Sequence, residues 1–206
     1  MADSQDPLVE FFFDVASPYS YLASTQMDGL ARRTSATVAW RPFLLGGLFA
    51  AVGNQAPALL KPRAAYMGRD LQRWARRYQV PLRWPTRFPI NTVKAQRMLL
   101  ALREEKGDAE CATLAAAFFT AYWADDRDVA DLDVLTAVAD DAGFDGAALA
   151  ERTQEPAIKE ALKGATTEAE KRGAFGAPTF FTGGEMYFGN DRLPLLEDAL
   201  RADGEA

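Results

Sequence analysis

The sequence contains no histidine and one cysteine, Cys111. Without histidine the chain cannot form a Ser-His-Asp or Cys-His triad, a histidine general base or most catalytic zinc sites. With one cysteine it has no Cys-x-x-Cys redox pair, no internal disulfide and no thiolate cluster, so we expect no metal site. Cys111 lies among alanines and leucines, which is typical of a small buried apolar side chain. Any catalysis must therefore use a hydroxyl, a carboxylate, a lysine or a group that a ligand supplies.

Long apolar stretches are also absent. No run approaches the ~18 apolar residues of a membrane-spanning helix. The segment from Met1 to Pro7 is acidic and polar, unlike a signal peptide. We therefore expect no membrane partner and a cytoplasmic location. Hydrophobic residues make up 49% of the chain and aromatic residues 11%, which is enough for a substantial buried core.

The net charge of −6 is distributed unevenly. Between positions 61 and 87, eight basic residues accompany one acidic residue, Asp70, so this stretch carries +7 and the rest of the chain −13. The stretch is either the solvated face of a helix or a positive field that attracts an anionic substrate. A nucleic-acid partner is not expected, because the acidic remainder would repel phosphate. The eight basic residues are Lys61, Arg63, Arg69, Arg73, Arg76, Arg77, Arg83 and Arg87.

The N-terminal part has the pattern of a β-α-β unit. Residues 9–13 form a short aromatic run that predicts a buried strand. Ser17 followed by Pro18 predicts a helix start, and the helical pattern continues to Arg33. Residues 37–43 predict a second strand. A strand, helix and strand in this order predict two parallel strands joined by a right-handed crossover.

From about Leu44 to Arg172 the pattern is helical and rich in alanine and leucine. The repeated alanines have no fixed period, so a helical block is expected and a solenoid is not. The periodicity predicts helices near residues 62–78, 91–106, 108–123, 131–142, 145–152 and 155–172.

Strand signals return near the C-terminal end. Residues 178–182 and 185–188 flank Gly183-Gly184, which predicts a β-hairpin. A final helix is expected at about 190–203. The predicted order is β-α-β, a helical block of about 130 residues, then β-β-α, which is an α/β fold.

Three separate segments carry a family resemblance. They are Asp14–Ala23 after the first strand, Phe175–Phe180 before the third, and Phe188–Leu193 at the start of the last helix. Together with Asp70–Ala75 they resemble the 2-hydroxychromene-2-carboxylate isomerases and the kappa-class glutathione transferases, relatives of the bacterial DsbA oxidoreductases. The resemblance spans nearly the whole chain.

The resemblance implies a thioredoxin-like domain interrupted by an all-helical insertion, the DsbA and kappa-transferase architecture. The glutathione-binding domain would comprise residues 7–45 and 173–206, and the insertion residues 46–172. Because the resembling families are commonly dimeric, a homodimer is expected.

Ser17 is the predicted catalytic residue. It stands where the redox relatives keep a cysteine, at a helix start where free amides favour negative charge. Because the chain has no cysteine there, the resemblance implies that glutathione supplies the thiol and that the Ser17 hydroxyl donates a hydrogen bond to its sulfur. Sequence alone also allows Ser17 to be an ordinary helix N-cap, and the two roles can coexist.

The resemblance assigns the rest of the glutathione site to two further segments. Pro178 corresponds to the family's cis-proline, and Ala177 before it would pair with the peptide backbone of glutathione. Gly189, Asn190 and Asp191 would hold the γ-glutamyl end. By sequence alone, Ala177-Pro178 could be a common turn, and Asn190 and Asp191 could simply cap the last helix.

A substrate pocket is expected beside this site. Asn91 matches a family motif near the active site, and Trp84, Phe88 and Trp123 are candidates for an apolar lining, although core packing is equally consistent with each aromatic residue. In the loop from Gly46 to Leu60 the chain departs from the isomerases of naphthalene degradation. Phe49 and Ala58 stand there in place of polar residues.

The resemblance implies a glutathione-dependent isomerase that interconverts 2-hydroxychromene-2-carboxylate, a small anionic aromatic acid, and trans-o-hydroxybenzylidenepyruvate. One alternative is a kappa-type transferase that conjugates glutathione to an electrophile. Another is a non-catalytic peptide-binding module of the thioredoxin fold, since the chain lacks the cysteines for disulfide exchange.

Overall fold

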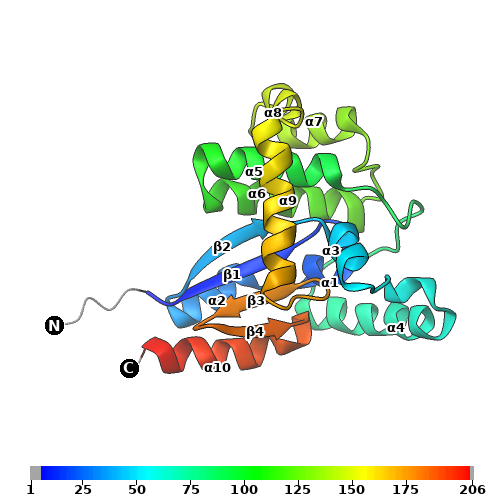
Figure 1. Cartoon of the computed structure of the whole chain (residues 1–206). Coiled ribbons are helices and arrows are strands. Elements are labelled where there is room, and N and C mark those ends of the chain that lie inside the picture. Colours follow the sequence, from blue (N-terminus) through cyan, green and yellow to red (C-terminus); the bar gives the residue numbers. More distant parts are fainter. Residues whose placement is uncertain (1–5, 205–206) are drawn as a thin grey trace.

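The computed structural model describes residues 6–204 and contains a four-stranded sheet with the order β2-β1-β3-β4 (Figure 1). β1 (Leu8–Phe13) pairs in parallel with β2 (Thr37–Pro42) and antiparallel with β3 (Thr179–Thr182). β4 (Glu185–Phe188) completes the sheet as the antiparallel partner of β3. Strands from the two ends of the chain therefore meet at the centre of one sheet.

Alternating side chains of β1 divide the core into two parts. Phe11 and Phe13 pack with Trp40 on one face, with ring centroids 5.1 to 5.3 Å apart. Phe12 points to the other face, where it meets Phe43 and Phe181. The period of two places consecutive aromatic residues on opposite faces. Full burial of each phenylalanine contributes about 1.5–3 kcal/mol to folding.

The first crossover is made of two helices, α1 (Pro18–Ser24) and α2 (Met27–Thr34), so the expectation of one continuous helix to Arg33 was wrong. The Ser24 and Thr25 hydroxyls each donate to a carbonyl three residues earlier, both at 2.7 Å. Such side-chain bonds compete with the helical ladder and favour a break.

The helical block lies between β2 and β3 in the chain. Each of the six predicted helices is present with both ends within two residues of the expected bounds. In Figure 1, α5 to α8 lie together on one side of the sheet, and α9 extends from them across it. The six helices are α4 (Lys61–Tyr78), α5 (Val93–Lys106), α6 (Asp108–Trp123), α7 (Leu132–Asp141), α8 (Gly146–Arg152) and α9 (Pro156–Lys171).

A further helix, α3 (Leu45–Val52), occupies a segment that the sequence analysis treated as a loop, and a short 3-10 turn, η1 (Pro57–Leu59), follows it. The α3 helix packs closely on α9. The Leu44 N–H donates to Thr166 Oγ1 at 3.0 Å, and a Cβ added at Gly47 would lie 3.3 Å from the Thr166 methyl group. This tertiary contact explains a helix in a segment that contains two adjacent glycines.

The C-terminal part follows the predicted order. Gly183 and Gly184 connect β3 to β4 with φ values of 54° and 84°, as a tight hairpin turn requires. After Gly189 the chain forms one 3-10 turn, η2 (Asn190–Arg192), and then α10 (Leu193–Gly204). The expected final helix is therefore present, although it begins with a 3-10 turn. The predicted fold class, an α/β thioredoxin-like fold with a helical insertion, is confirmed.

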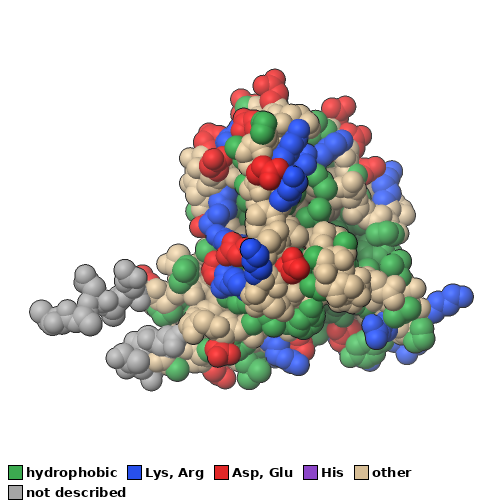
Figure 2. Space-filling model, in the orientation of Figure 1, with side chains coloured by type: hydrophobic (Ala, Val, Ile, Leu, Met, Phe, Trp, Pro, Cys, Tyr) green, Lys and Arg blue, Asp and Glu red, His purple; other side chains and the backbone are tan. Residues whose placement is uncertain are grey.

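Basic and acidic side chains are interspersed over the face that carries α9 (Figure 2). On this face Arg172 forms ion pairs with Glu10 at 2.6 Å and with Glu168 at 3.1 Å, and Arg41 pairs with the same two carboxylates. Among the helices of residues 6–204, none is long and apolar enough to cross a membrane.

Candidate functional site

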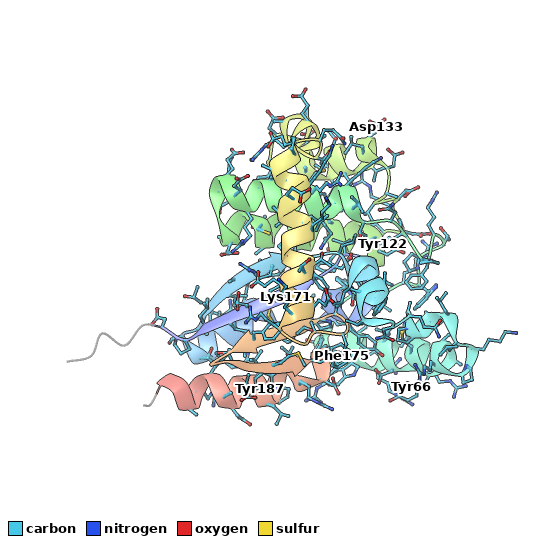
Figure 3. All side chains as sticks on the ribbon, in the orientation of Figure 1. Tyr66, Tyr122, Asp133, Lys171, Phe175 and Tyr187 are labelled. Atoms are coloured by element: carbon cyan, nitrogen blue, oxygen red, sulfur yellow. The ribbon has the colours of Figure 1, made fainter. Side chains whose placement is uncertain are left out.

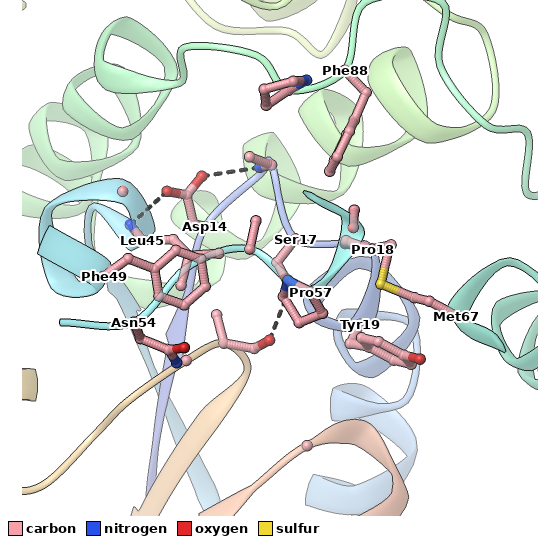
Figure 4. A pocket seen from close by; sticks show the side chains of 18 of the residues that line it. Asp14, Ser17, Pro18, Tyr19, Leu45, Phe49, Asn54, Pro57, Met67 and Phe88 are labelled. Carbon is pink, nitrogen blue, oxygen red and sulfur yellow. Dashed lines mark hydrogen bonds between the residues drawn. The ribbon is translucent and has the colours of Figure 1, made fainter. Parts of the chain in front are cut away.

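A cavity of about 1070 Å³ lies where the thioredoxin-like part meets the helical insertion. The three motif segments all contribute to it: residues 14 and 16–19, residues 175–177 and residues 188–191. The opposite wall comes from α3, η1, α4 and the connection to α5 (Figure 4). Residues as far apart in the chain as Asp14 and Asp191 thus surround one space.

Ser17 is the N-cap of α1 and lies at the centre of this cavity wall (Figure 4). Its oxygen accepts the Ser20 N–H at 3.1 Å, and its hydroxyl donates to the Ala177 carbonyl at 3.0 Å. Ser17 is 3% exposed. The N-cap interpretation is therefore confirmed, and the same hydroxyl joins the first helix to the loop before β3.

The Ala177–Pro178 peptide bond is cis, as predicted. The Ala177 carbonyl accepts the Ser17 hydroxyl, whereas the Ala177 N–H makes no hydrogen bond to any residue between positions 6 and 204. Both groups belong to a residue that lines the cavity. The neighbouring Gly176 is required by close packing, because a Cβ there would lie 2.7 Å from the Phe188 ring. Ala177 thus offers a donor and an acceptor to an extended peptide.

The loop before η2 forms the adjoining part of the wall. Gly189 has a φ of 103°, and a Cβ at this position would lie 2.5 Å from Asp191 Oδ1. Asn190 is 1% exposed, and the Asp191 carboxylate forms an ion pair with Arg192 at 2.7 Å. The first amides of a helical segment have no carbonyl partner within it and are suited to an anion. This loop can therefore offer amides to a carboxylate and the Asp191 carboxylate to an amine.

Asp14 organises the floor of the cavity (Figure 4), a role that was not predicted from the sequence. Its buried carboxylate accepts hydrogen bonds from the Ala16 N–H at 2.9 Å, the Leu45 N–H at 2.8 Å and the Thr92 hydroxyl at 2.7 Å. Burial raises the pKa of Asp14 above its ordinary value, and these hydrogen bonds oppose the rise. Asp14 thereby ties the Ser17 loop to the starts of α3 and α5. Its place between an aromatic strand and Ser-Pro was the signal that could have found it.

The opposite wall carries long side chains from α4. The Tyr19 hydroxyl donates to Asp70 at 2.9 Å, which links α1 to α4 across the cavity. Burial and the Asp70 carboxylate raise the pKa of Tyr19, so the phenol keeps its proton at neutral pH. Arg63 and Tyr66 line the same wall. Figure 3 shows Tyr66 on α4 and Phe175 in the loop before β3, toward the same side of the molecule.

The structure divides the four predicted pocket residues. Phe88 and Asn91 line the cavity, and the Asn91 side chain accepts the Val93 N–H at 3.0 Å at the start of α5. Trp123 does not line the cavity, because it is fully buried and its indole N–H donates to the Val15 carbonyl at 2.8 Å. Trp84 packs against Phe88 and lies outside this cavity, but it is 41% exposed and lines a neighbouring pocket of about 430 Å³ together with Phe88. The expected role of Trp123 in the cavity is corrected to packing, and Trp84 belongs to the neighbouring pocket.

Most of the basic stretch faces away from the cavity. Of its eight basic residues only Arg63 lines the cavity. Arg83 and Arg87 form ion pairs with Asp126 at 3.3 Å and Asp128 at 3.2 Å. The lining also contains the carboxylates of Asp14, Asp70 and Asp191. A positive field at the cavity would therefore have to come mainly from Arg63.

Neither a reactive thiol nor a metal-binding group is found among the described residues. Cys111 is fully buried in α6, and burial raises the pKa of its thiol, so it is the inert apolar side chain that the sequence indicated. Within the described part of the chain, no group of three or more Cys, Asp or Glu side chains is arranged to hold a metal ion.

The two departures from the isomerase pattern, Phe49 and Ala58, both line the cavity.

Comparisons with known proteins agree with this geometry. The model of the family described as the DSBA-like thioredoxin domain matches residues 8–201. A 2-hydroxychromene-2-carboxylate isomerase of Sphingobium xenophagum is 34% identical over 93% of this chain and 97% of its own length. Human glutathione S-transferase kappa 1 is 29% identical over 93% of this chain and 90% of its own.

A solved structure of a 2-hydroxychromene-2-carboxylate isomerase superposes with a TM-score of 0.84 at 33% identity, and the match covers 94% of each chain. The likeness therefore includes both the thioredoxin-like part and the helical insertion. Because the family model spans the whole sheet and the insertion between its strands, the chain belongs to the DSBA-like thioredoxin family.

Proposed function

We propose that the protein is a glutathione-dependent isomerase of the 2-hydroxychromene-2-carboxylate isomerase type. The observation that carries the proposal is the pairing of Ser17 with Ala177 in one cavity wall, 3.0 Å apart. A hydroxyl lies there beside a residue whose N–H and carbonyl both suit an extended thiol peptide. The isomerase relative at 34% identity over nearly the full length supports this choice of reaction.

The residues of the wall fit glutathione in three places. Ala177 pairs with the cysteinyl backbone, because its N–H has no other partner among the described residues. The amides at Asn190 and Asp191 take the γ-glutamyl carboxylate, and the Asp191 side chain takes the amino group. Ser17 then lies beside the thiol. Pro178 fixes the direction of the Ala177 backbone.

When bound, glutathione would supply a thiolate as a reversible nucleophile: once the ring C–O bond of the hemiketal has opened to a ketone and a phenol, addition of the thiolate to the conjugated double bond leaves a single bond that can rotate, and elimination returns the thiolate unchanged. Ser17 favours the charged form of the thiol by donating a hydrogen bond to sulfur. The apolar wall around Phe49 and Phe88 excludes water from the aromatic part of the substrate, and Arg63 attracts its carboxylate.

The test measures the amount of open-chain product and the concentration of glutathione in the same reaction. Purified protein is incubated with 2-hydroxychromene-2-carboxylate, with and without glutathione, and the open-chain product is measured by absorbance. We expect conversion only with glutathione, whose concentration stays constant. Absence of glutathione-dependent conversion would contradict the proposal.

A conjugating enzyme is the second candidate, because a kappa-class glutathione transferase matches 93% of the chain. The same cavity would serve, and the two reactions differ in the fate of glutathione. Stoichiometric consumption of glutathione, with an adduct detected by mass spectrometry, would favour conjugation over isomerisation.

A further inference from the structure

Under the proposed function, the single hydrogen of the Ser17 hydroxyl has two acceptors: the Ala177 carbonyl and the sulfur of bound glutathione. It is directed to the Ala177 carbonyl at 3.0 Å, while the Ser17 oxygen accepts the Ser20 N–H at 3.1 Å. A serine hydroxyl has one donor hydrogen. Ser17 therefore cannot donate to Ala177 and to a bound sulfur at the same time.

The Ala177 carbonyl depends on this hydrogen. Within residues 6–204, Ser17 makes the only hydrogen bond to it, and Ala177 is 9% exposed. A largely buried carbonyl that loses its donor is left in an unfavourable state. If the hydroxyl turns to sulfur, the carbonyl needs another donor, and the cavity that Ala177 lines is where a bound ligand can supply one.

We propose that the cysteinyl N–H of glutathione is this new donor, so that the Ala177 carbonyl restricts activation to thiols that carry a peptide N–H beside the sulfur-bearing residue. This inference rests on the proposed function. When the N–H bonds to Ala177, the Ser17 hydroxyl rotates about its Cβ–Oγ bond toward the sulfur. The oxygen stays in place, so the bond from the Ser20 N–H is kept. A thiol without that N–H leaves the hydroxyl on Ala177.

The experiment compares glutathione with an analogue in which an ester oxygen replaces the N–H of the γ-glutamyl-cysteine bond. The analogue keeps the shape, the thiol and both termini. The thiol pKa of each ligand is measured by thiolate absorbance at saturation, in the wild type and in Ser17→Ala. Ser17→Thr, which keeps a hydroxyl and a helix-capping oxygen, is the matched control.

In the wild type we expect the bound analogue to have a thiol pKa about one unit above that of bound glutathione, a tenfold change in the thiolate-to-thiol ratio. In Ser17→Ala the two ligands should have equal thiol pKa values, because no hydroxyl remains to be redirected. Ser17→Thr should restore the difference.

Two results would overturn the inference while leaving the proposed function intact. In the first, both ligands have the same thiol pKa in the wild type, and Ser17→Ala raises both values. In the second, the two ligands differ in thiol pKa by the same amount in the wild type and in Ser17→Ala. The first would show that the hydroxyl reaches sulfur without help from the N–H. The second would show that the N–H acts without Ser17. If glutathione fails to bind at all, the inference and the proposed function both fail.

Discussion

The two walls of the cavity offer a ligand different kinds of contact. The wall of the thioredoxin-like part presents main-chain groups around Ser17 and Ala177, together with the side chains of Tyr19, Phe175 and Asp191. The wall of the helical insertion presents long side chains, among them Phe49, Arg63 and Tyr66. Main-chain groups held by a sheet and a helix start keep their positions when side chains change, whereas the insertion wall changes with each substitution.

This difference assigns the two walls to different ligands. Under the proposed function, the main-chain wall would hold glutathione and the side-chain wall would hold the substrate. Substitutions in the first wall should therefore change glutathione binding, and substitutions in the second should change substrate use alone.

The largest effect on glutathione binding is expected from Gly189→Ala. The new Cβ would lie 2.5 Å from Asp191 Oδ1 and displace the carboxylate that is proposed to hold the γ-glutamyl amine. We expect affinity for glutathione to fall by about 10- to 100-fold, the loss of one charge-assisted hydrogen bond. Isothermal titration calorimetry measures this.

Gly184→Ala is the matched control. Gly184 also has a positive φ, 84°, but its new Cβ would meet nothing within 4 Å. Both variants should lose about 1–3 kcal/mol of folding stability from backbone strain. Equal loss of glutathione affinity in both would contradict the role of Asp191.

A smaller effect, on stability, is expected from Asp14→Asn. The NH2 group of asparagine would face one of the three groups that now donate hydrogen bonds to the carboxylate, so one of these bonds would be lost. This loss should lower the free energy of unfolding by about 1–3 kcal/mol. Chemical denaturation at neutral pH gives this value.

The pH dependence of the wild type provides a second test at the same residue. Because burial raises the pKa of Asp14 above its ordinary value of 3.8, the folded state holds this proton more tightly than the unfolded state. Its contribution to stability is full below pH 3.8 and is lost as the pH rises toward the folded-state pKa. Asp14→Asn should lack this loss. Parallel pH profiles for the two proteins would show that Asp14 is not perturbed.

Tyr19→Phe tests the boundary between the walls. It removes the hydrogen bond of 2.9 Å to Asp70 but keeps the ring. We expect the KM for the aromatic substrate to rise by about 2- to 10-fold, because α4 loses the hydrogen bond that holds its side of the cavity to α1. The Kd for glutathione should stay unchanged. If glutathione binding falls as much as substrate binding does, the two walls do not act separately.

The smallest effect is expected from Arg63→Gln. It should lower kcat/KM for the anionic substrate about 2- to 5-fold at low salt and flatten the salt dependence, because a single charge steers weakly. Arg76→Gln, on the same helix but outside the cavity lining, is the control and should change neither. Equal effects of the two substitutions would assign steering to the whole basic stretch.

The sheet and most helices could be predicted because their signals are local. The aromatic run of β1, the Gly183-Gly184 turn and the alanine-rich helices each lie within a few residues. The break after Ser24 could not be predicted in this way, because it depends on which carbonyl each hydroxyl bonds. The α3 helix depends on packing against Thr166, more than 110 residues later.

The residues of the candidate site also differ in whether a local sequence signal predicts them. The positions of Ser17 and Asp191 in the cavity lining and the cis bond before Pro178 could be predicted, because each residue lies in a short motif. Asp14 was missed because its role depends on Thr92, 78 residues away. Trp123 was misplaced because an aromatic residue looks the same in sequence whether it faces a cavity or the core.

The central claim, that Ser17 activates the thiol of bound glutathione, is tested most directly by the thiol pKa in the wild type and in Ser17→Ala. The variant should still bind glutathione, because Ala177 and the loop at Asp191 remain. Loss of one charge-assisted hydrogen bond of about 1.5–3 kcal/mol should raise the bound-thiol pKa by about one to two units and lower the rate at neutral pH. An unchanged low pKa with full glutathione-dependent activity would show that Ser17 is only the N-cap of α1.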